Sequence, residues 1–596
     1  MDKKTVLTGL AVLAVVVLAA GFRFYDIKDY PPGLFPDEAA NGEDVRLILN
    51  GDVRPFYPRG NGREALFFFL EAASIKLFGI GVWQLHIVSA AVGVLTVLAV
   101  YFATRVWFGR LSGLLAAGML ATNHWHVTMS RTGFRAILIP LFIALFTAFV
   151  GYTIRAVKRG STMPNSKFQI PNKLQNTKSK SHTRRSITMS YVYAALAGAA
   201  FAGGFYTYIA YRVMAGVVLG VVLLMLLAAL HPKIGWPHLV RYWQQLAIGC
   251  IAAAIVLAPL AGYFVMHPDA FVGRAGQVSV FNGELQNEYG GGTLVGTILY
   301  STRETLAAFF IGAGDLNWRH NVPGYPLLNP LVGALFLLGL AWAINGTVMV
   351  FYKIVRGREI HLGMIFPYLL LIIAGMLAPV ITTAEGMPHG LRSIGLLFPI
   401  FMLAGTAGSV IIYWLKLKVK QEAWRAAGRG AMAGLLILGL LYDGALYFMI
   451  ARNDADAYYA YRGDLTTVAQ FLNDRRRDYP NEPRPYLVLD KFSLQTVHFL
   501  TSVAAHEHTV GDEVHPDEAQ HKWVQIDPAT SHLWQLAPGE IMVFTQSTIF
   551  DADRYAKQHT DVELLESTTN RWGQEIMRVY KGVGQEKVNG DGSLDA

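Results

Sequence analysis

The sequence predicts an α-helical polytopic membrane protein, with about 11 transmembrane helices and a C-terminal soluble α/β domain. The first observation is composition: 53% of the 596 residues are hydrophobic and only 16% are charged, which is too apolar for a soluble protein of this length. The second is a series of apolar runs of about 17 to 25 residues, each long enough to cross a bilayer as a helix. The third is that these runs stop after Ile450.

The connections between the runs alternate in charge. Lysine and arginine concentrate in every second connection, beginning with Lys3 and Lys4, and the opposite short connections are poor in lysine. The positive-inside rule therefore makes the basic connections cytoplasmic, and an odd number of crossings places the C-terminal part outside. Residues 1–21 also fit a secretory signal peptide, and that alternative stays open. The predicted spans are 5–22, 82–108, 111–127, 136–154, 189–209, 213–230, 246–266, 330–352, 362–382, 393–415 and 431–450.

Two outer segments of the transmembrane part are too long to be simple links. Residues 23–81 contain short apolar stretches near 45–49 and 65–78, which predict amphipathic helices lying along the membrane surface. Residues 267–329 are rich in glycine and proline turns and predict loops. On the other side, residues 158–185 are rich in serine, asparagine and lysine and predict disordered cytoplasmic chain.

The chain accordingly divides into a transmembrane domain, 1–450, and an extracytoplasmic domain, 451–596. In the second domain, short strand-like stretches alternate with helical ones, which favours an α/β fold. The strands are predicted at 486–489, 541–545, 562–566 and 575–580, and the helices at 466–477, 494–505 and 552–559. The stretch HEHTVGDEVHPDEAQH, 506–521, contains metal-ligating residue types, but such polar clusters are more often solvated loops.

Charge and cysteine content exclude other classes of protein. The formal net charge is +9, but the basic residues lie in short segments between apolar runs, which does not indicate a nucleic-acid surface. The single cysteine, Cys250, lies within an apolar run, so neither a disulfide framework nor a cysteine metal site is available.

A pair of carboxylates, Asp37 and Glu38, follows the proline-rich turn PPGLFP soon after the first apolar run. Three interpretations stay open. The pair could begin a helix, with Asp37 as its cap and Glu38 favouring the helix dipole. Asp37 could be a general base where outer water, lipid headgroups and an acceptor meet. The two carboxylates could also bind a divalent cation.

Cationic and aromatic residues recur at the outer ends of the predicted helices. Each alone is typical of a residue that anchors a helix at the headgroups. Together they could bind a phosphate, which needs guanidinium or imidazolium donors held in place. The pattern therefore predicts group transfer from a phosphorylated lipid. The set comprises Arg131, Arg135, Tyr206, Tyr208, Tyr211, Arg212, Arg319, His320, His389 and Arg392, and the acid Glu385 lies close to His389 in the sequence.

The order of these motifs resembles the GT-C glycosyltransferases, and within them the group of protein mannosyltransferases and lipid A aminoarabinose transferases. FPDEA (35–39) is similar to the acidic motif of the first outer loop in that family, and the resemblance covers about residues 5–415. The later motifs are MSRTGFR (129–135), GGFYTYIAYR (203–212) and PHGLRSIGLLFP (388–399).

The resemblance implies an inverting transfer of a sugar from a polyprenyl-phosphate donor to a lipid, glycan or protein acceptor on the outer face of the cell membrane. Asp37 would be the catalytic base, and Glu38 would support its position or hold the acceptor. The W-W-D type of signature of oligosaccharyltransferases is absent, so no firmly metal-dependent site is implied, although a divalent cation stays possible. The candidates for the donor phosphate are Arg131, Arg135, Arg212, His389 and Arg392; those for the substrate pocket are Tyr206, Tyr208, Tyr211, Arg319, His320 and Glu385.

Two functions from other classes remain alternatives. A transporter or flippase of a lipid-linked substrate would place ionisable groups near the bilayer midplane, where we predict none, and would show inverted repeats, which the hydropathy pattern lacks. The chain could also be an inactive scaffold whose outer domain binds partners.

Overall fold

The computed structural model describes most of the chain. The described residues are 3–161, 173–236, 240–272, 286–288, 291–358, 361–383, 388–501 and 523–583. They form two compact units. The first comprises Met1–Ile27, Arg54–Phe67 and His86–Ala451, and the second Lys28–Val53, Phe68–Leu85 and Arg452–Ala596. The second unit therefore contains residues 28–53 and 68–81 of the long outer loop 23–81, and the first four residues of the predicted span 82–108.

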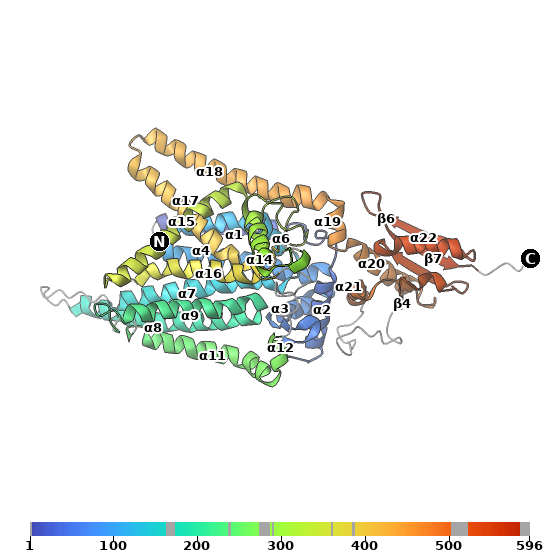
Figure 1. Ribbon diagram of the computed structural model, residues 1–596, viewed down its shortest axis with the longest axis horizontal. Helices are drawn as coiled ribbons and strands as arrows, with labels where there is room; N and C mark the ends of the chain where they lie inside the picture. The colour runs from blue at the N-terminus through green and yellow to red at the C-terminus, as the bar shows by residue number, and fades with distance from the viewer. Residues whose placement is uncertain are drawn as a thin grey trace, which may run out of the picture. The chain divides into compact units, whose positions relative to one another are not determined.

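Helices occupy every predicted apolar run (Figure 1). Among the described residues, nine helices are long and apolar enough to cross a membrane, and α5 and α16 are apolar but shorter. The prediction of a helical polytopic protein is confirmed, and the number of crossings stays a prediction. The helices are α1 (Lys3–Phe24), α4 (Val82–Phe108), α5 (Arg110–Thr122), α6 (His124–Met129), α7 (Leu138–Ser161), α8 (Lys173–Gly203), α9 (Val213–Ala229), α11 (Trp243–Met266), α15 (Pro330–Val355), α16 (Ile365–Ile381), α17 (Leu397–Lys418) and α18 (Glu422–Ala445).

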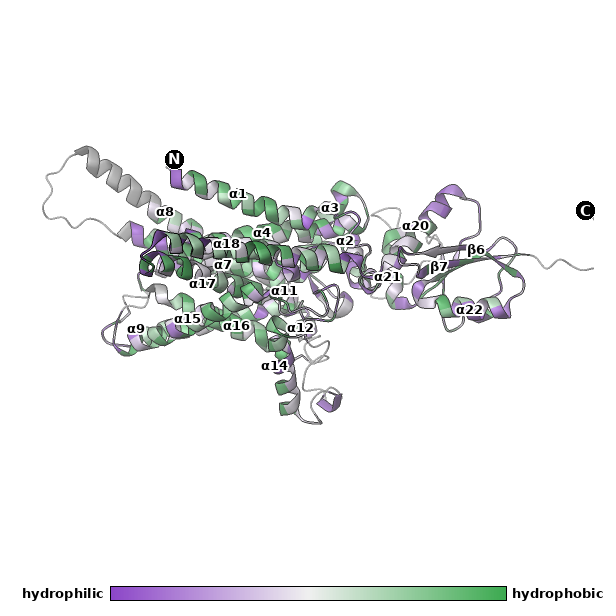
Figure 2. Cartoon of the chain, turned by 90° about the horizontal axis from the view of Figure 1, so that it is seen from above, coloured by the Kyte–Doolittle hydropathy of each residue, from purple (hydrophilic) through white to green (hydrophobic). Residues whose placement is uncertain are grey.

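Small residues let the helices of the first unit approach one another closely. A methyl group on Gly198 of α8 would collide with the backbone oxygen of Gly249 of α11. The Ser112 hydroxyl of α5 lies 2.6 Å from that of Ser409 of α17. Such contacts pack helices where no water is available to drive association. The long helices are predominantly hydrophobic along their lengths, as Figure 2 shows, which suits a lipid environment.

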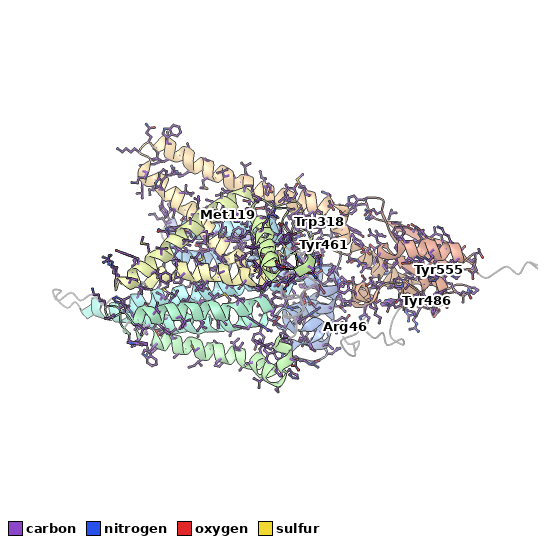
Figure 3. All side chains as sticks on the ribbon, viewed as in Figure 1. Arg46, Met119, Trp318, Tyr461, Tyr486 and Tyr555 are labelled. Atoms are coloured by element: carbon purple, nitrogen blue, oxygen red, sulfur yellow. The ribbon has the colours of Figure 1, made fainter. Side chains whose placement is uncertain are left out.

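The second unit contains a five-stranded mixed sheet with strand order β4-β3-β5-β7-β6. Strand β3 is parallel to β4 and β5, whereas β7 is antiparallel to β5 and β6. The sheet lies between two hydrophobic cores, one shared with α20 and α21 and the other with α22. Tyr486 and Tyr555, labelled in Figure 3, belong to the second of these cores. The elements are α20 (Gly463–Asp478), β3 (Tyr486–Val488), α21 (Lys491–Thr501), β4 (Val524–Ile526), β5 (Ile541–Thr545), α22 (Ile549–Gln558), β6 (Val562–Thr569) and β7 (Glu575–Gly582).

This sheet confirms the predicted α/β domain and adds one strand. Strand β4 was not predicted because its three residues are too short to show an alternating pattern. The predicted strands at 486–489, 541–545, 562–566 and 575–580 all lie on observed strands. The histidine-rich stretch 506–521 lies outside the described residues.

Three expectations about the connections need correction. Helix α2 (Pro36–Leu49) is not an amphipathic surface helix, because Glu38, Glu43, Asp44 and Arg46 are all buried on it. The segment 267–329 is not only loop, because it contains α12 (Pro268–Val272) and the 17-residue α14 (Leu294–Phe310). In the basic segment 158–185, helix α8 already begins at Lys173, and residues 162–172 lie outside the described part. The second short apolar stretch forms α3 (Leu66–Phe78).

Candidate active site

The acidic pair lies at the first turn of α2 in the second unit. Pro36 is the first residue of this helix, where its missing N–H costs nothing. Glu38 is fully buried and its Oε2 accepts a hydrogen bond of 3.0 Å from the backbone N–H of Phe35. Asp37 is exposed. The capping interaction is therefore made by Glu38, and Asp37 lies in the same first turn, at the positive end of the helix dipole.

Two arginines of the first unit converge on one buried carboxylate. Arg135 Nε lies 3.4 Å from Glu64 Oε2, and Arg212 Nη2 lies 3.6 Å from Glu64 Oε1. The side chain of Glu64 is 2% exposed, whereas those of Arg135 and Arg212 are 13% and 22% exposed. The group thus has two positive charges and one negative charge, and both guanidinium side chains remain partly exposed.

The backbone of three short elements places Glu64, Arg135 and Arg212 near one another. Glu64 ends β2 (Arg63–Glu64), which pairs antiparallel with β1 (Phe56–Tyr57). Gly62 precedes β2 with a φ of +96°, and a side chain there would collide with the ring of Phe56. Arg135 and Arg212 lie in the short helical turns that lead into α7 and α9. Both guanidinium groups thus start from the N-terminal ends of long helices, where anions are favoured.

Aromatic rings surround the arginines and form a small recess. The Arg135 guanidinium lies 5.2 Å from the centre of the Tyr208 ring, and that of Arg212 lies 4.5 Å from the Phe271 ring. Arg212 also donates a hydrogen bond of 2.7 Å to the backbone oxygen of Phe271. The recess is lined by Phe56, Gly62, Glu64, Arg135, Tyr208, Ile209, Arg212, Ala270 and Phe271. Because rings exclude water on several sides, a charge-assisted hydrogen bond to an anion would be strong here.

Arg131 occupies a different environment. Its Nη1 donates hydrogen bonds to the backbone oxygens of Phe22, Arg23 and Tyr25 at 3.2, 3.0 and 2.8 Å. The side chain is fully buried, and its guanidinium lies 5.4 Å from the centre of the Tyr447 ring. Arg131 therefore satisfies carbonyl groups at the C-terminal end of α1.

Of the three candidate tyrosines, only Tyr208 lines the recess. The hydroxyl of Tyr206 donates to the backbone oxygen of Val256 at 2.7 Å and accepts from the N–H of Leu260 at 3.2 Å. It therefore inserts into the hydrogen-bond ladder of α11 beside Pro259, which has no N–H to donate. Tyr211 is fully buried, and Gly204 leaves room for its ring.

Two candidate histidines form a second cluster of the first unit. The rings of His320 and His389 stack with their centres 4.8 Å apart. His320 Nδ1 lies 2.9 Å from Asp315 Oδ2, which also accepts a bond of 2.6 Å from the N–H of Gly390. Asp315 Oδ1 accepts from the N–H of Asn317 at 2.8 Å.

Candidate metal-ligand atoms of Asp315, His320 and His389 lie within 4.8 Å of one another, so these residues could hold a cation. Asp315 Oδ2 also contacts both His320 Nδ1 and the N–H of Gly390, so the cluster joins the 315–322 segment to the 388–393 segment.

The remaining candidates do not join the recess. Arg319 Nε donates to Asn317 Oδ1 at 3.2 Å, and its guanidinium lies 5.8 Å from the centre of the Phe134 ring. Arg392 is 9% exposed, and Glu385 lies outside the described residues.

Sequence reasoning missed Glu64 and Asp315. The signal for Glu64 was an acid directly after the turn GNGR in an outer segment, and that for Asp315 was an acid five residues before His320.

Neither a protein-family model nor a curated protein matches the chain. Among solved structures, it is similar to ArnT from Cupriavidus metallidurans bound to undecaprenyl phosphate, with 14% identity and a TM-score of 0.45 over 96% of this chain and 97% of that chain. It is similar to the apo oligosaccharyltransferase from Archaeoglobus fulgidus, with 14% identity and a TM-score of 0.47 over 83% of this chain and 64% of that chain. A third similar structure is AglB of the same organism with an inhibitory peptide and a dolichol-phosphate, with 12% identity and a TM-score of 0.44 over 99% of this chain and 75% of that chain. Likenesses this weak carry no conclusion about function.

Proposed function

We propose that the chain is a membrane glycosyltransferase of the GT-C type that moves a sugar from a polyprenyl-phosphate donor to an acceptor on the outer face of the membrane. The observation that carries this proposal is the convergence of Arg135 and Arg212 on Glu64 in an aromatic recess. A guanidinium pair of this kind suits a phosphate, because its N–H groups match phosphate oxygens. Glu64 holds both arginines in place until the phosphate takes over part of their hydrogen bonding.

An apolar cavity of the first unit supports a lipid-linked donor. It has a volume of about 400 Å³ and is lined by residues of α7, α8, α9, α11 and α16. Its lining extends from Phe146 to Ile154 on α7 and from Val218 to Met225 on α9. These positions are 11 to 19 residues beyond Arg135 and 6 to 13 beyond Arg212. At 1.5 Å of rise per residue, these positions lie about 9 to 29 Å further along the two helices. The cavity offers an isoprenoid chain a site on the same helices that begin at the cationic recess.

The reaction would be a single displacement. The Asp37 carboxylate takes the proton of the acceptor nucleophile, whose electron pair forms a bond to the anomeric carbon of the sugar. The bond between this carbon and the phosphate oxygen breaks, and polyprenyl phosphate leaves with the electron pair. Arg135 and Arg212 stabilise the negative charge that develops on the leaving phosphate. Displacement from the opposite side inverts the anomeric configuration.

The test is to incubate the purified full-length protein with polyprenyl-phosphate sugars and candidate acceptors and to measure released polyprenyl phosphate. We expect Asp37→Asn to lower kcat by about 100-fold or more, the usual contribution of a general base, with donor affinity unchanged. Asp29→Asn is the matched control, because Asp29 is another exposed acid of the second unit. Unchanged turnover in Asp37→Asn would reject this residue as the base. No release with any donor, together with saturable lipid translocation in vesicles, would favour a transporter.

A further inference from the structure

Helix α2 packs against α21, so the helix that carries the acidic pair belongs to the same compact unit as the C-terminal sheet (Figure 1). The contact is close at two glycines. A methyl group on Gly42 of α2 would collide with the ring of Phe499 of α21. A methyl group on Gly33, just before α2, would collide with the backbone oxygens of Tyr461 and Arg462. Only a residue without a side chain allows this distance between the two segments.

Buried polar contacts fix the register of α2 on α21. The Thr496 hydroxyl donates a hydrogen bond of 3.0 Å to the backbone oxygen of Leu34, two residues before the first residue of α2. His498 Nδ1 lies 2.9 Å from Glu43 Oε1, and Arg46 Nη1 lies 3.0 Å from Glu43 Oε2. Glu43, Arg46 and His498 are at most 4% exposed, so breaking one of these contacts leaves a buried charge with fewer partners.

The starts of α20 and α21, beside which α2 lies, are joined by hydrogen bonds of their own. Arg462 makes a two-point ion pair with the buried Asp464, with N–O distances of 3.1 and 3.2 Å, and donates to the Ser493 hydroxyl at 2.8 Å. These bonds join the start of α20 to the start of α21. The ring of Phe35, two residues before Asp37, packs edge to face against the ring of Phe492 of α21, with the ring centres 5.7 Å apart.

We propose that the C-terminal domain is a positioning element of the catalytic site: α21, through Thr496, His498 and Phe499, holds α2 so that the Asp37 carboxylate stays where the acceptor needs it. This inference rests on the proposed function, in which Asp37 is the base. The sequence gives no hint of the role, because Gly42 and Phe499 are separated by more than 450 residues. A catalytic group displaced by about 1 Å can lose 100-fold in rate, so a small shift of α2 would suffice.

The test combines a bulky substitution with its compensation. Gly42→Ala places a methyl group against the Phe499 ring, and the double variant Gly42→Ala/Phe499→Leu removes the collision. We expect Gly42→Ala to lower kcat by about tenfold or more, with KM for the donor within about twofold, and the double variant to recover most of kcat. Gly434→Ala is the matched control, because Gly434 lies in α18 with open space around it. His498→Leu should also lower kcat, and His498→Asn, which restores a donor toward Glu43, should rescue it.

Amide hydrogen exchange provides a readout that needs no activity. We expect faster exchange at residues 34–49 in Gly42→Ala and His498→Leu, with exchange in α7 and α9 unchanged. Wild-type kcat together with wild-type exchange at 34–49 in both variants would overturn the positioning role while leaving the proposed function intact. A wild-type protein inactive with every donor would reject the proposed function, and exchange at 34–49 would still decide whether α21 holds α2. Low kcat in Gly42→Ala that the double variant does not recover would also contradict the proposal.

Discussion

Glu64 gives the cationic recess two properties at once. It neutralises one of two positive charges that would otherwise repel each other at the starts of α7 and α9, and it orients both guanidinium groups toward one point. The contacts of 3.4 and 3.6 Å are longer than good charge-assisted hydrogen bonds. Glu64 therefore holds Arg135 and Arg212 by long contacts, which under the proposed function would let the donor phosphate compete for their N–H groups.

The arginines should act on the donor rather than on folding. We expect Arg135→Gln or Arg212→Gln to raise KM for the polyprenyl-phosphate sugar by about 10- to 100-fold, which corresponds to ~1.5–3 kcal/mol for a lost hydrogen bond to a charged group. Steady-state kinetics with varied donor would measure this. Arg303→Gln is the control, because Arg303 is 80% exposed on α14. Wild-type values of both KM and kcat in the two recess variants would show that the phosphate binds elsewhere.

At the scale of one helix, α11 shows how a proline is accommodated within an apolar run. Pro259 cannot donate a hydrogen bond to the preceding turn of α11. The Tyr206 hydroxyl, which reaches this turn from the end of α8, bonds both Val256 and Leu260. Tyr206, which the motif GGFYTYIAYR suggested as a substrate-pocket residue, therefore joins the end of α8 to α11.

We expect Tyr206→Phe to lower the free energy of unfolding by ~1–3 kcal/mol, because buried backbone groups of α11 lose a partner. Thermal unfolding of the detergent-solubilised protein should show a lower Tm, with KM for donor and acceptor unchanged. Tyr413→Phe is the control, because Tyr413 is 55% exposed on α17. An unchanged Tm combined with a raised KM would instead support the original prediction that Tyr206 lines the substrate pocket.

For the whole molecule, the alternating charge of the connections predicts the side of the membrane on which each part lies. In a Cys250→Ala background, Gln558→Cys in the C-terminal domain should react with a membrane-impermeant maleimide in intact cells. Lys420→Cys, between α17 and α18, should react only after the membrane is opened. Both positions are exposed, so burial does not decide the outcome. Labelling of Lys420→Cys alone in intact cells would reverse the predicted orientation.

Composition and the pattern of hydrophobic residues were sufficient to predict most helices and strands, but not which of them contact one another. The apolar runs predicted the helices that are long and apolar enough to cross a membrane, because a bilayer span requires a length and hydrophobicity that few other structures share. They did not predict α14. The same sequence led to a wrong expectation for α2, whose buried charges are paired through Glu43, Arg46 and His498 rather than exposed at a membrane surface. The contact between Glu43 and His498 joins segments more than 450 residues apart, so it leaves no local pattern in the sequence.

The candidate site shows the same limit. Arg135 and Arg212 were predicted as phosphate ligands and Tyr208 as a pocket residue, among eleven residues at outer helix ends. The structure brings these three together in one recess. Arg131 has the same local sequence context, yet it bonds carbonyls at the end of α1, which only the packing of α1 reveals. Glu64 was missed because one acid in a long outer segment is indistinguishable from a solvated residue until the arginines are placed.

The dependence of α2 on α21 also limits how this protein can be recombined with its relatives. Exchanging residues 452–596 alone would leave the glycine at position 42 facing an unrelated ring and Glu43 without its imidazole. A working chimera would have to transplant Lys28–Val53 and Phe68–Leu85 together with the C-terminal part. The natural module for exchange is therefore discontinuous in the chain, and it carries the acidic pair with it.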